Sequence, residues 1–342
     1  TLGEKHWEQT AILMENLRQF LAIDLGVSAD EIAFTRNVSE GISFLASGLD
    51  WRTGNSVIVP EREFPANVYP WLNLEARGVT LRFLPLRNGI FDVSDLEKLA
   101  DKATRVVSLS SIQFFSGFRA QIEPISAFCR SQGIILAADA IQHYGAFPIR
   151  PKELGLDYVA FGGHKWLMAG EGIGFVYCRR ELAERLQPGE IGWQGVRQWT
   201  DFFDYRLDFQ DGARRFSTGT VSAIGLYMLN AAVRFLVGTG WDQIGSRILS
   251  LADHIHKRSI ERGFFPVLAT SPTSGIVTIA TPGVDVGLLV QGLQTRGFQI
   301  SARQGCIRFS PHFYNTVEEI DACFQALGEC EHSSVIPAKP GI

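Results

Sequence analysis

Short, near-continuous runs of apolar residues recur along the first half of the chain, where breaks rich in glycine, serine, asparagine and proline separate them from helical patterns. Strands that helices cover on both faces lack polar alternation, as these runs do. Their alternation with helical patterns predicts an α/β domain with a mainly parallel sheet. Seven runs carry this signal: Ile32–Thr35, Ser56–Val59, Thr80–Leu84, Arg105–Leu109, Ile134–Ala138, Tyr158–Phe161 and Gly174–Cys178.

Helical spacing of apolar residues marks both ends of the chain. It predicts a helix from Trp7 to Ile23, which Gly26 ends. After Arg215 the pattern changes to long helices and isolated strand signals, followed by a helix after Thr316, which is typical of a smaller α+β domain. The predicted segments are helices at Ala223–Leu236 and Trp241–Arg262, and strands at Gly275–Ala280, Gly297–Ser301 and Cys306–Ser310.

Length and composition set the expected organisation. Because 342 residues exceed one usual domain, we expect a large domain at 1–235, a small C-terminal domain at 236–332 and a loose tail at 333–342. A hydrophobic share of 46% is typical of a globular protein, and a net charge of −4 argues against a general binder of nucleic acid. No apolar run approaches the roughly 18 residues that a membrane helix needs.

The cysteines are scattered along the chain. They show neither the spacing of metal ligands nor that of a disulfide framework, so we expect no metal site. Such a set fits a reducing cytosol, and the N-terminus has the pattern of an amphipathic helix rather than of a signal peptide. We therefore expect a cytoplasmic protein. The five are Cys129, Cys178, Cys306, Cys323 and Cys330.

Two charged residues follow neighbouring strand signals. Asp139 comes directly after the run Ile134–Ala138, and Lys165 follows the run Tyr158–Phe161, with room for one crossover helix between them. Ligands of open α/β sheets bind outside the carboxyl ends of the strands. We therefore expect this acid and this amine to face the same crevice.

A lysine and an aspartate in one crevice suit pyridoxal phosphate. A desolvated lysine forms a Schiff base with an aldehyde, and a buried aspartate pairs with a pyridinium nitrogen, which makes the ring an electron sink. Taken singly, Asp139 is more simply a helix cap and Lys165 a solvated side chain. Their joint arrangement, with flanking glycines and the adjacent His164, favours the cofactor.

These motifs, in this order, resemble the class V aminotransferases of the fold-type I pyridoxal-phosphate enzymes. That group includes cysteine desulfurases, selenocysteine lyase, kynureninase and isopenicillin-epimerase-like proteins. The resemblance runs from about Phe34 to Ile320, nearly the whole chain. It implies a fold with a large domain around a mainly parallel seven-stranded sheet and a smaller C-terminal α+β domain.

The resemblance assigns roles around the cofactor ring. Lys165 would form the Schiff base and then move the proton at the substrate's α-carbon, and Asp139 would bond the pyridine nitrogen. Gln142 and Gln113 would contact the phenolic oxygen of the ring, and Phe64 would stack on the ring. From local sequence alone, a core position is an equally good interpretation of Phe64.

The resemblance also implies a phosphate site. The segment Thr35–Gly41 is similar to the family's phosphate loop, with the backbone amides of Val38 and Ser39 and the Ser39 hydroxyl at a helix start. A simple helix cap is the alternative. His164 would contact the phosphate as well, whereas Gly162 stands where many relatives carry a phosphate-binding serine.

Two further motifs extend the implied site. The run Arg215–Thr220 is similar to R-F-x-x-G-T, in which Gly219 and Thr220 reach the phosphate of a neighbouring subunit; this implies a homodimer, and an ordinary turn is the alternative. Arg308 lies in a segment similar to the family's Arg…Tyr-Asn-Thr and would bind the substrate's α-carboxylate. The aromatic residues between 193 and 205 are candidates for lining the substrate pocket or for interface packing.

We expect a class V aminotransferase-like enzyme that acts at the α-carbon of an amino acid by transamination. The alternatives are a C–S or β-elimination lyase that needs no cysteine, a desulfurase-like enzyme, an amino-acid epimerase, and a non-catalytic pyridoxal-phosphate-binding module. Desulfurases need a mobile nucleophilic cysteine on a loop, and the stretch Gln291–Gly305 contains none. Cys306 shares a predicted strand face with Arg308, so we interpret it as a small structural cysteine.

Overall fold

The computed structural model describes residues 2–334, in which two compact units form. The segments 87–90 and 113–119 belong to the second unit although they lie inside the predicted large domain, and the predicted domain limits stay a prediction. The last helix ends at Ser334, and the rest of the predicted tail, 335–342, lies outside the described residues. Among the described residues, the first unit consists of 2–86, 91–112 and 120–241, and the second of 87–90, 113–119 and 242–334.

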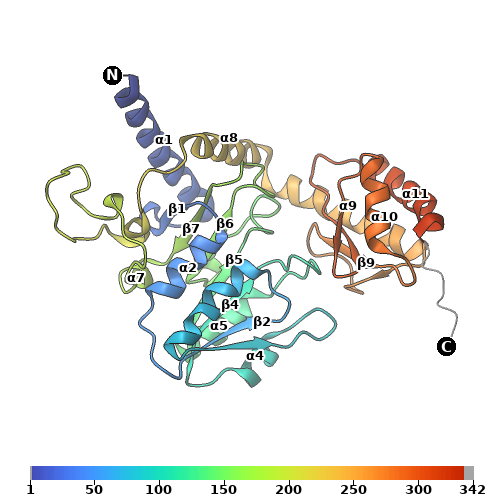
Figure 1. The fold of residues 1–342 in the computed structure, drawn as a ribbon, viewed down its shortest axis with the longest axis horizontal. Coiled ribbons are helices and arrows are strands. Elements are labelled where there is room, and N and C mark those ends of the chain that lie inside the picture. The colour runs from blue at the N-terminus through green and yellow to red at the C-terminus, as the bar shows by residue number, and fades with distance from the viewer. Residues whose placement is uncertain (1, 335–342) are drawn as a thin grey trace. The chain divides into compact units, whose positions relative to one another are not determined.

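A seven-stranded sheet forms the centre of the first unit (Figure 1). Its order is β1-β7-β6-β5-β4-β2-β3, and β7 alone runs antiparallel to both of its neighbours. The prediction of a mainly parallel seven-stranded sheet is therefore confirmed. The strands are β1 (Ile32–Thr35), β2 (Ser56–Pro60), β3 (Thr80–Leu84), β4 (Thr104–Ser110), β5 (Ile135–Asp139), β6 (Tyr158–Gly162) and β7 (Gly174–Cys178).

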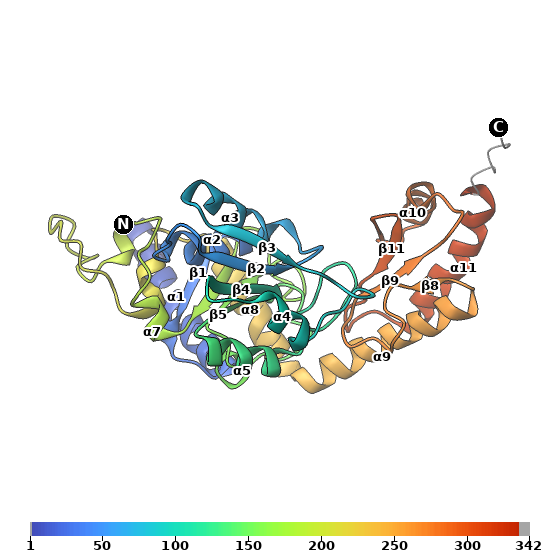
Figure 2. The same ribbon diagram turned by 90° about the horizontal axis from the view of Figure 1, so that it is seen from below.

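Helices cover both faces of this sheet. Helices α2 and α3 lie on one face and α5 lies on the other (Figure 2). Every residue of β1, β2, β5, β6 and β7 is buried, which explains why these strands show no polar alternation in the sequence. The helices are α1 (Leu2–Leu25), α2 (Val38–Gly48), α3 (Tyr69–Leu72), α4 (Val93–Leu99), α5 (Ile122–Gln132), α6 (Pro151–Leu154), α7 (Arg180–Ala183) and α8 (Ala223–Thr239), with 3₁₀ turns at Ala29–Glu31, Pro65–Asn67, Asn73–Arg77, Trp193–Gly195 and Gly212–Phe216.

One helix lies in the crossover between β5 and β6, as the sequence predicts. Helix α6 is a single turn between those strands. Pro151 stands at its start, and Gly155 ends it in the left-handed conformation with φ of 70°. Most of the connection is therefore loop, and this loop begins at Asp139.

The second unit is built on a four-stranded antiparallel sheet in the order β10-β11-β9-β8. Along β11, Ile307 and Phe309 are buried while Cys306 and Arg308 are half-buried, so the expected alternation is confirmed. The predicted strand Gly297–Ser301 is wrong in its position, because Gly297 has a φ of 91° and turns the chain after α10. The elements are α9 (Trp241–Glu261), β8 (Phe265–Pro266), β9 (Val277–Ala280), α10 (Val286–Thr295), β10 (Ser301–Arg303), β11 (Cys306–Phe309) and α11 (Val317–Ser334).

No single helix within residues 2–334 combines the length and apolar character required to cross a membrane. Helices α8 and α9 meet the criteria of length and composition only when they are taken together as a bent pair.

The core of the second unit depends on an aromatic pair. Phe324 of α11 is fully buried and stacks on Phe309, with ring centroids 5.4 Å apart. We expect Phe324→Ala to lower the free energy of unfolding by about 3–5 kcal/mol, because it removes buried surface and leaves a cavity. Chemical denaturation measures this change. Ile260→Ala, at an exposed position of α9, is the control and should change stability by less than about 0.5 kcal/mol; equal effects would contradict this packing.

Candidate active site

Asp139 lies at the carboxyl end of β5, in the middle of the large sheet. Its side chain is 2% exposed, and its Oδ1 accepts a hydrogen bond of 2.9 Å from the backbone N–H of Ile141. Burial raises the pKa of Asp139 to about 6, although this hydrogen bond and the positive charge of Lys165 both lower it. A carboxyl in this position is a strong acceptor for a cationic partner.

Lys165 follows the next strand, β6, and lies at the same edge of the sheet. Its Nζ is 5.3 Å from the centre of the Phe64 ring, within the range of a cation–π contact. Its charge acts on Asp139, so the structure brings together the predicted lysine, acid and aromatic residue. Phe64 is 39% exposed, which argues against the interpretation as a core residue.

The loop around Lys165 packs tightly on the loop after β5. Gly145 has a φ of 107°, and a Cβ there would lie 2.3 Å from the carbonyl carbon of Trp166. The indole Nε1 of Trp166 donates a hydrogen bond of 2.9 Å to Oε1 of Gln142. This bond uses the acceptor of the buried Gln142 amide, while its Nε2 has no hydrogen-bond partner among the described residues. Gln142 therefore offers a buried donor to an acceptor that the chain itself does not supply.

The predicted phosphate loop connects β1 to α2. Asn37 caps the helix, because its side chain accepts a hydrogen bond of 3.0 Å from the backbone N–H of Glu40. Ser39 is exposed in the first turn and is not the capping residue. Both interpretations of this segment therefore fit: a cap is present, and the helix start with Val38 and Ser39 still offers backbone donors to an anion.

His164 and Gly162 flank this region. His164 is exposed, and its pKa is lowered first by desolvation and then by the charge of Lys165. A Cβ at Gly162 would lie 2.5 Å from Cδ1 of Ile141, so a serine would require Ile141 to move. Tight packing on Ile141 therefore favours glycine at this position.

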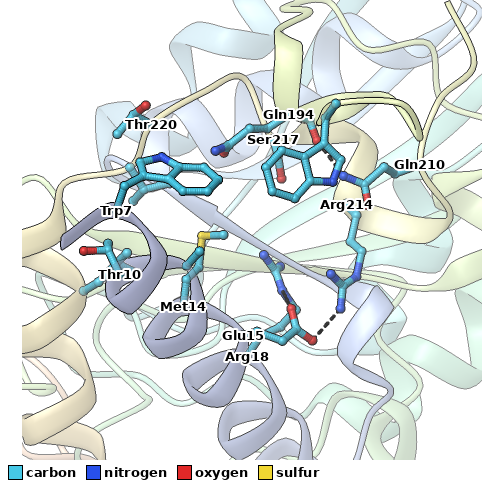
Figure 3. A pocket seen from close by; sticks show the side chains of 14 residues that line it. Trp7, Thr10, Met14, Glu15, Arg18, Gln194, Gln210, Arg214, Ser217 and Thr220 are labelled. Atoms are coloured by element: carbon cyan, nitrogen blue, oxygen red, sulfur yellow. Dashed lines mark hydrogen bonds and ion pairs between the residues drawn. The ribbon is translucent and has the colours of Figure 1, made fainter. Parts of the chain in front are cut away.

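Thr220 lies in a different place within the first unit. It lines a cavity of about 330 Å³ together with Gln194, Trp199 and residues of α1 (Figure 3). Glu15 and Arg214 form an ion pair of 2.6 Å at this cavity. The aromatic rings of Trp7, Trp193, Trp199 and Phe202 contact one another, with neighbouring centroids 5.8–6.5 Å apart. The roles expected of Gly219 and Thr220 at a second subunit stay a prediction.

Two predicted residues belong to the second unit. Oε1 of Gln113 accepts hydrogen bonds from the backbone N–H groups of Phe115 and Ser116, at 2.6 and 2.8 Å, so this oxygen is used within its own turn. Arg308 donates from Nη1 to the carbonyl oxygen of Phe114 at 2.8 Å, and its buried Nε has no hydrogen-bond partner among the described residues. Arg308 is thus fixed at one nitrogen and keeps a donor for another acceptor.

Glu63 also belongs to the site, although it was not predicted from the sequence. It is 8% exposed and accepts hydrogen bonds from both the backbone N–H and the hydroxyl of Ser110, which stands opposite Asp139 in the parallel ladder of β4 and β5. Burial raises the pKa of Glu63 to about 7, and the charge of Asp139 adds to this. Its position just after β2 and beside Phe64 is the signal that could have identified it.

The raised pKa of Glu63 makes stability depend on pH. Because the folded-state pKa lies above the usual 4.5, the contribution of the neutral carboxyl is complete below pH 4.5 and is lost as the pH rises through about 7. Glu63→Gln has no carboxyl that ionises at this position, so the variant does not lose this contribution to the free energy of unfolding as the pH rises. We therefore expect the unfolding free energy of the cofactor-free variant, relative to wild type, to rise by up to about 3 kcal/mol between pH 4.5 and 7.

Urea denaturation at a series of pH values measures this difference. Glu61→Gln, at an exposed position two residues away, is the matched control. Parallel pH profiles of wild type and Glu63→Gln would contradict a buried carboxyl that ionises near neutral pH.

Comparison with known proteins identifies the family. The family model for class V aminotransferases matches residues 3–323. A probable cysteine desulfurase of Methanothermobacter thermautotrophicus is 28% identical, over 92% of this chain and 82% of that protein. The structure of the cysteine desulfurase CsdA from Escherichia coli is 25% identical with a TM-score of 0.88, and covers 96% of this chain and 86% of its own.

The fold is also that of the cystine C–S lyase C-DES, solved with its product cysteine persulfide. The TM-score is 0.88 at 24% identity, over 94% of this chain and 87% of the lyase. A lysine variant of C-DES has been solved with glycine covalently linked to its pyridoxal-phosphate cofactor. Pyridoxal phosphate is the cofactor of the family. With a matching model over nearly its whole length, the chain belongs to the class V aminotransferase family of pyridoxal-phosphate enzymes.

Proposed function

We propose that this protein is a pyridoxal-phosphate-dependent C–S lyase that acts on an amino acid of the cysteine class. The observation that carries the cofactor site is the convergence of Lys165, Phe64 and the buried Asp139 at one edge of the sheet. The family match and the names of the relatives, two cysteine desulfurases and a C–S lyase, support the reaction class. They favour this alternative over transamination, our main expectation from the sequence.

The residues present fit the cofactor. The unpartnered Nε2 of Gln142 is a donor suited to the phenolic oxygen of the ring, and the exposed face of Phe64 is suited to stacking on it. Asp139 is an acceptor for the protonated pyridine nitrogen. Val38 and Ser39 at the start of α2, together with His164, are donors suited to the phosphate.

The residues of the site have different roles in this proposal. Bound pyridoxal phosphate supplies an electron sink that stabilises negative charge on the substrate's α-carbon. Asp139 keeps the proton on the pyridine nitrogen, because ion pairing returns its carboxyl to the charged form that burial disfavours. Lys165 binds the cofactor and moves the proton at the α-carbon. Arg308 binds the substrate's carboxylate through the donor on Nε.

The state of the thiols favours release of sulfide without a protein persulfide. Burial raises the pKa of Cys129 to about 12 and that of Cys323 to about 11, and it raises the pKa of Cys178 too. These thiols stay protonated near pH 7 and are therefore poor nucleophiles. Cys306 is half-buried within β11, where it pairs with Ala280 of β9 and lacks the reach of a loop. Cysteine and water then yield sulfide, ammonia and pyruvate.

We expect the cofactor-loaded protein to release sulfide and pyruvate in equal amounts from cysteine or a close analogue. Lys165→Ala should reduce this rate by at least about 10³-fold, because the α-proton loses its carrier. Cys306→Ser, the control, should stay within about twofold of wild type. A panel of amino acids, with sulfide, pyruvate, other keto acids and enantiomers measured in parallel, tests the reaction.

Each other product pattern contradicts part of the proposal. Loss of sulfide release in Cys306→Ser would indicate a desulfurase that uses a protein persulfide. Keto acid formed only with an amino-group acceptor would indicate transamination, inversion of the substrate an epimerase, and no turnover across the panel a non-catalytic module.

Arg308 should contribute to substrate binding more than to turnover. We expect Arg308→Gln to raise KM by about 10–100-fold with kcat within a few-fold, because one charge-assisted contact to the carboxylate is lost. Steady-state kinetics of sulfide release measures both constants. Arg303→Gln, on the neighbouring strand β10, is the matched control and should leave KM unchanged. An unchanged KM in Arg308→Gln would show that this arginine does not bind substrate.

A further inference from the structure

A second polar cavity lies at the opposite edge of the large sheet from Asp139. Its volume is about 410 Å³, and Ile135, the first residue of β5, is in its wall, whereas Asp139 is the last residue of that strand. The end of α5, the helix α6 and the segment after β7 contribute the other walls. All of these belong to the first unit. The titratable residues lining the cavity are Cys129, Arg130, Lys152, Asp157, Tyr177, Arg179 and Arg185.

Positive charge exceeds negative charge in this lining. Lys152 pairs with Glu31 at 2.7 Å, and Arg179 pairs with Asp157 at 2.9 Å. Arg130 and Arg185 form no ion pair or side-chain hydrogen bond with any described residue. The cavity therefore has two guanidinium groups available after its carboxylates are neutralised.

Tyr177, a residue with a buried hydroxyl, also lines this cavity. Tyr177 is fully buried, and its hydroxyl has no hydrogen-bond partner within the part of the chain that the structure describes. Burial raises the pKa of Tyr177 well above its usual value, and the charges of Glu31 and Asp157 add to this, so the hydroxyl is a donor at every physiological pH. A buried donor without a protein acceptor indicates that a water or a ligand accepts its hydrogen bond.

A glycine leaves room for one of these arginines. Gly155 has a φ of 70°, and a Cβ there would lie 2.5 Å from Nη2 of Arg130 and 2.0 Å from the hydroxyl of Ser126. That hydroxyl donates a hydrogen bond of 3.0 Å to the Gly155 carbonyl oxygen. The missing side chain of Gly155 thus leaves room for Arg130 to pack against this turn. The Cys129 thiol, with its pKa raised to about 12, offers no nucleophile, so the cavity is suited to binding rather than to chemistry.

We propose that this cavity binds a small oxyanion, a phosphate or carboxylate group, through Arg130 and Arg185, with the Tyr177 hydroxyl as an additional donor. Arginine forks match the geometry of both groups, and the volume suits a small metabolite rather than a macromolecule. Because the cavity and Asp139 lie at opposite ends of β5, the anion and the amino-acid substrate bind without competing. This site does not depend on which reaction the enzyme performs.

Calorimetric titration of the cofactor-loaded protein tests the proposal, since loading fills the phosphate site of the cofactor first. Inorganic phosphate and malonate are titrated separately, in chloride at constant ionic strength, and malonate is titrated in the Arg308→Gln background, which lacks the proposed carboxylate contact of the active site. We expect one anion per chain, with binding weakened at least about tenfold in the double variant Arg130→Gln/Arg185→Gln. Tyr177→Phe, which keeps the ring, should weaken binding several-fold without lowering the melting temperature.

Arg52→Gln, at an exposed position of the same unit outside the cavity, is the control and should bind as wild type does. Binding by either anion that depends on the two arginines supports the proposal and identifies the preferred group. Equal affinity in the double variant, or no binding of either anion up to about 10 mM, would overturn it. Circular dichroism confirms that each variant is folded.

Discussion

The buried carboxyl of Asp139 is the constraint on which the site of the first unit depends. A carboxylate that is 2% exposed keeps its charge only where donors or cations face it. The chain supplies one backbone N–H, from Ile141, and the charge of Lys165, yet burial outweighs both and raises the pKa to about 6. A protonated ring nitrogen is the kind of partner that such a carboxyl lacks, which links the packing of the sheet to the chemistry of the cofactor.

The geometry of the parallel sheet explains why the other groups lie nearby. Strands β2, β4, β5 and β6 end at one edge of the sheet. This edge therefore brings together residues from four separate parts of the sequence: Glu63, Ser110, Asp139 and Lys165. Glu63 is close enough to Asp139 for the charge of Asp139 to add to the raised pKa of Glu63. The neutral form of Glu63 is therefore favoured while Asp139 is charged.

Much of this arrangement could be predicted from the sequence, because buried parallel strands leave a strong apolar signal. All seven strands of the large sheet appear within about two residues of their predicted limits, and Asp139 and Lys165 follow the strands as expected. The predictions from the sequence fail where the conformation or the role of a residue depends on the folded structure around it. Gly297 turns the chain where a strand was predicted, and the importance of Glu63 depends on Ser110, which lies on another strand. The unpartnered donors of Gln142 and Tyr177 likewise exist only in the folded chain.

Reduction of the cofactor-loaded protein with borohydride, followed by peptide mapping by mass spectrometry, identifies the lysine that carries the cofactor. We expect one phosphopyridoxyl group per chain, attached to Nζ of Lys165, and the same attachment site in Asp139→Asn with weaker retention of the cofactor. A label on any other lysine, or none after supplementation with pyridoxal phosphate, would contradict this expectation.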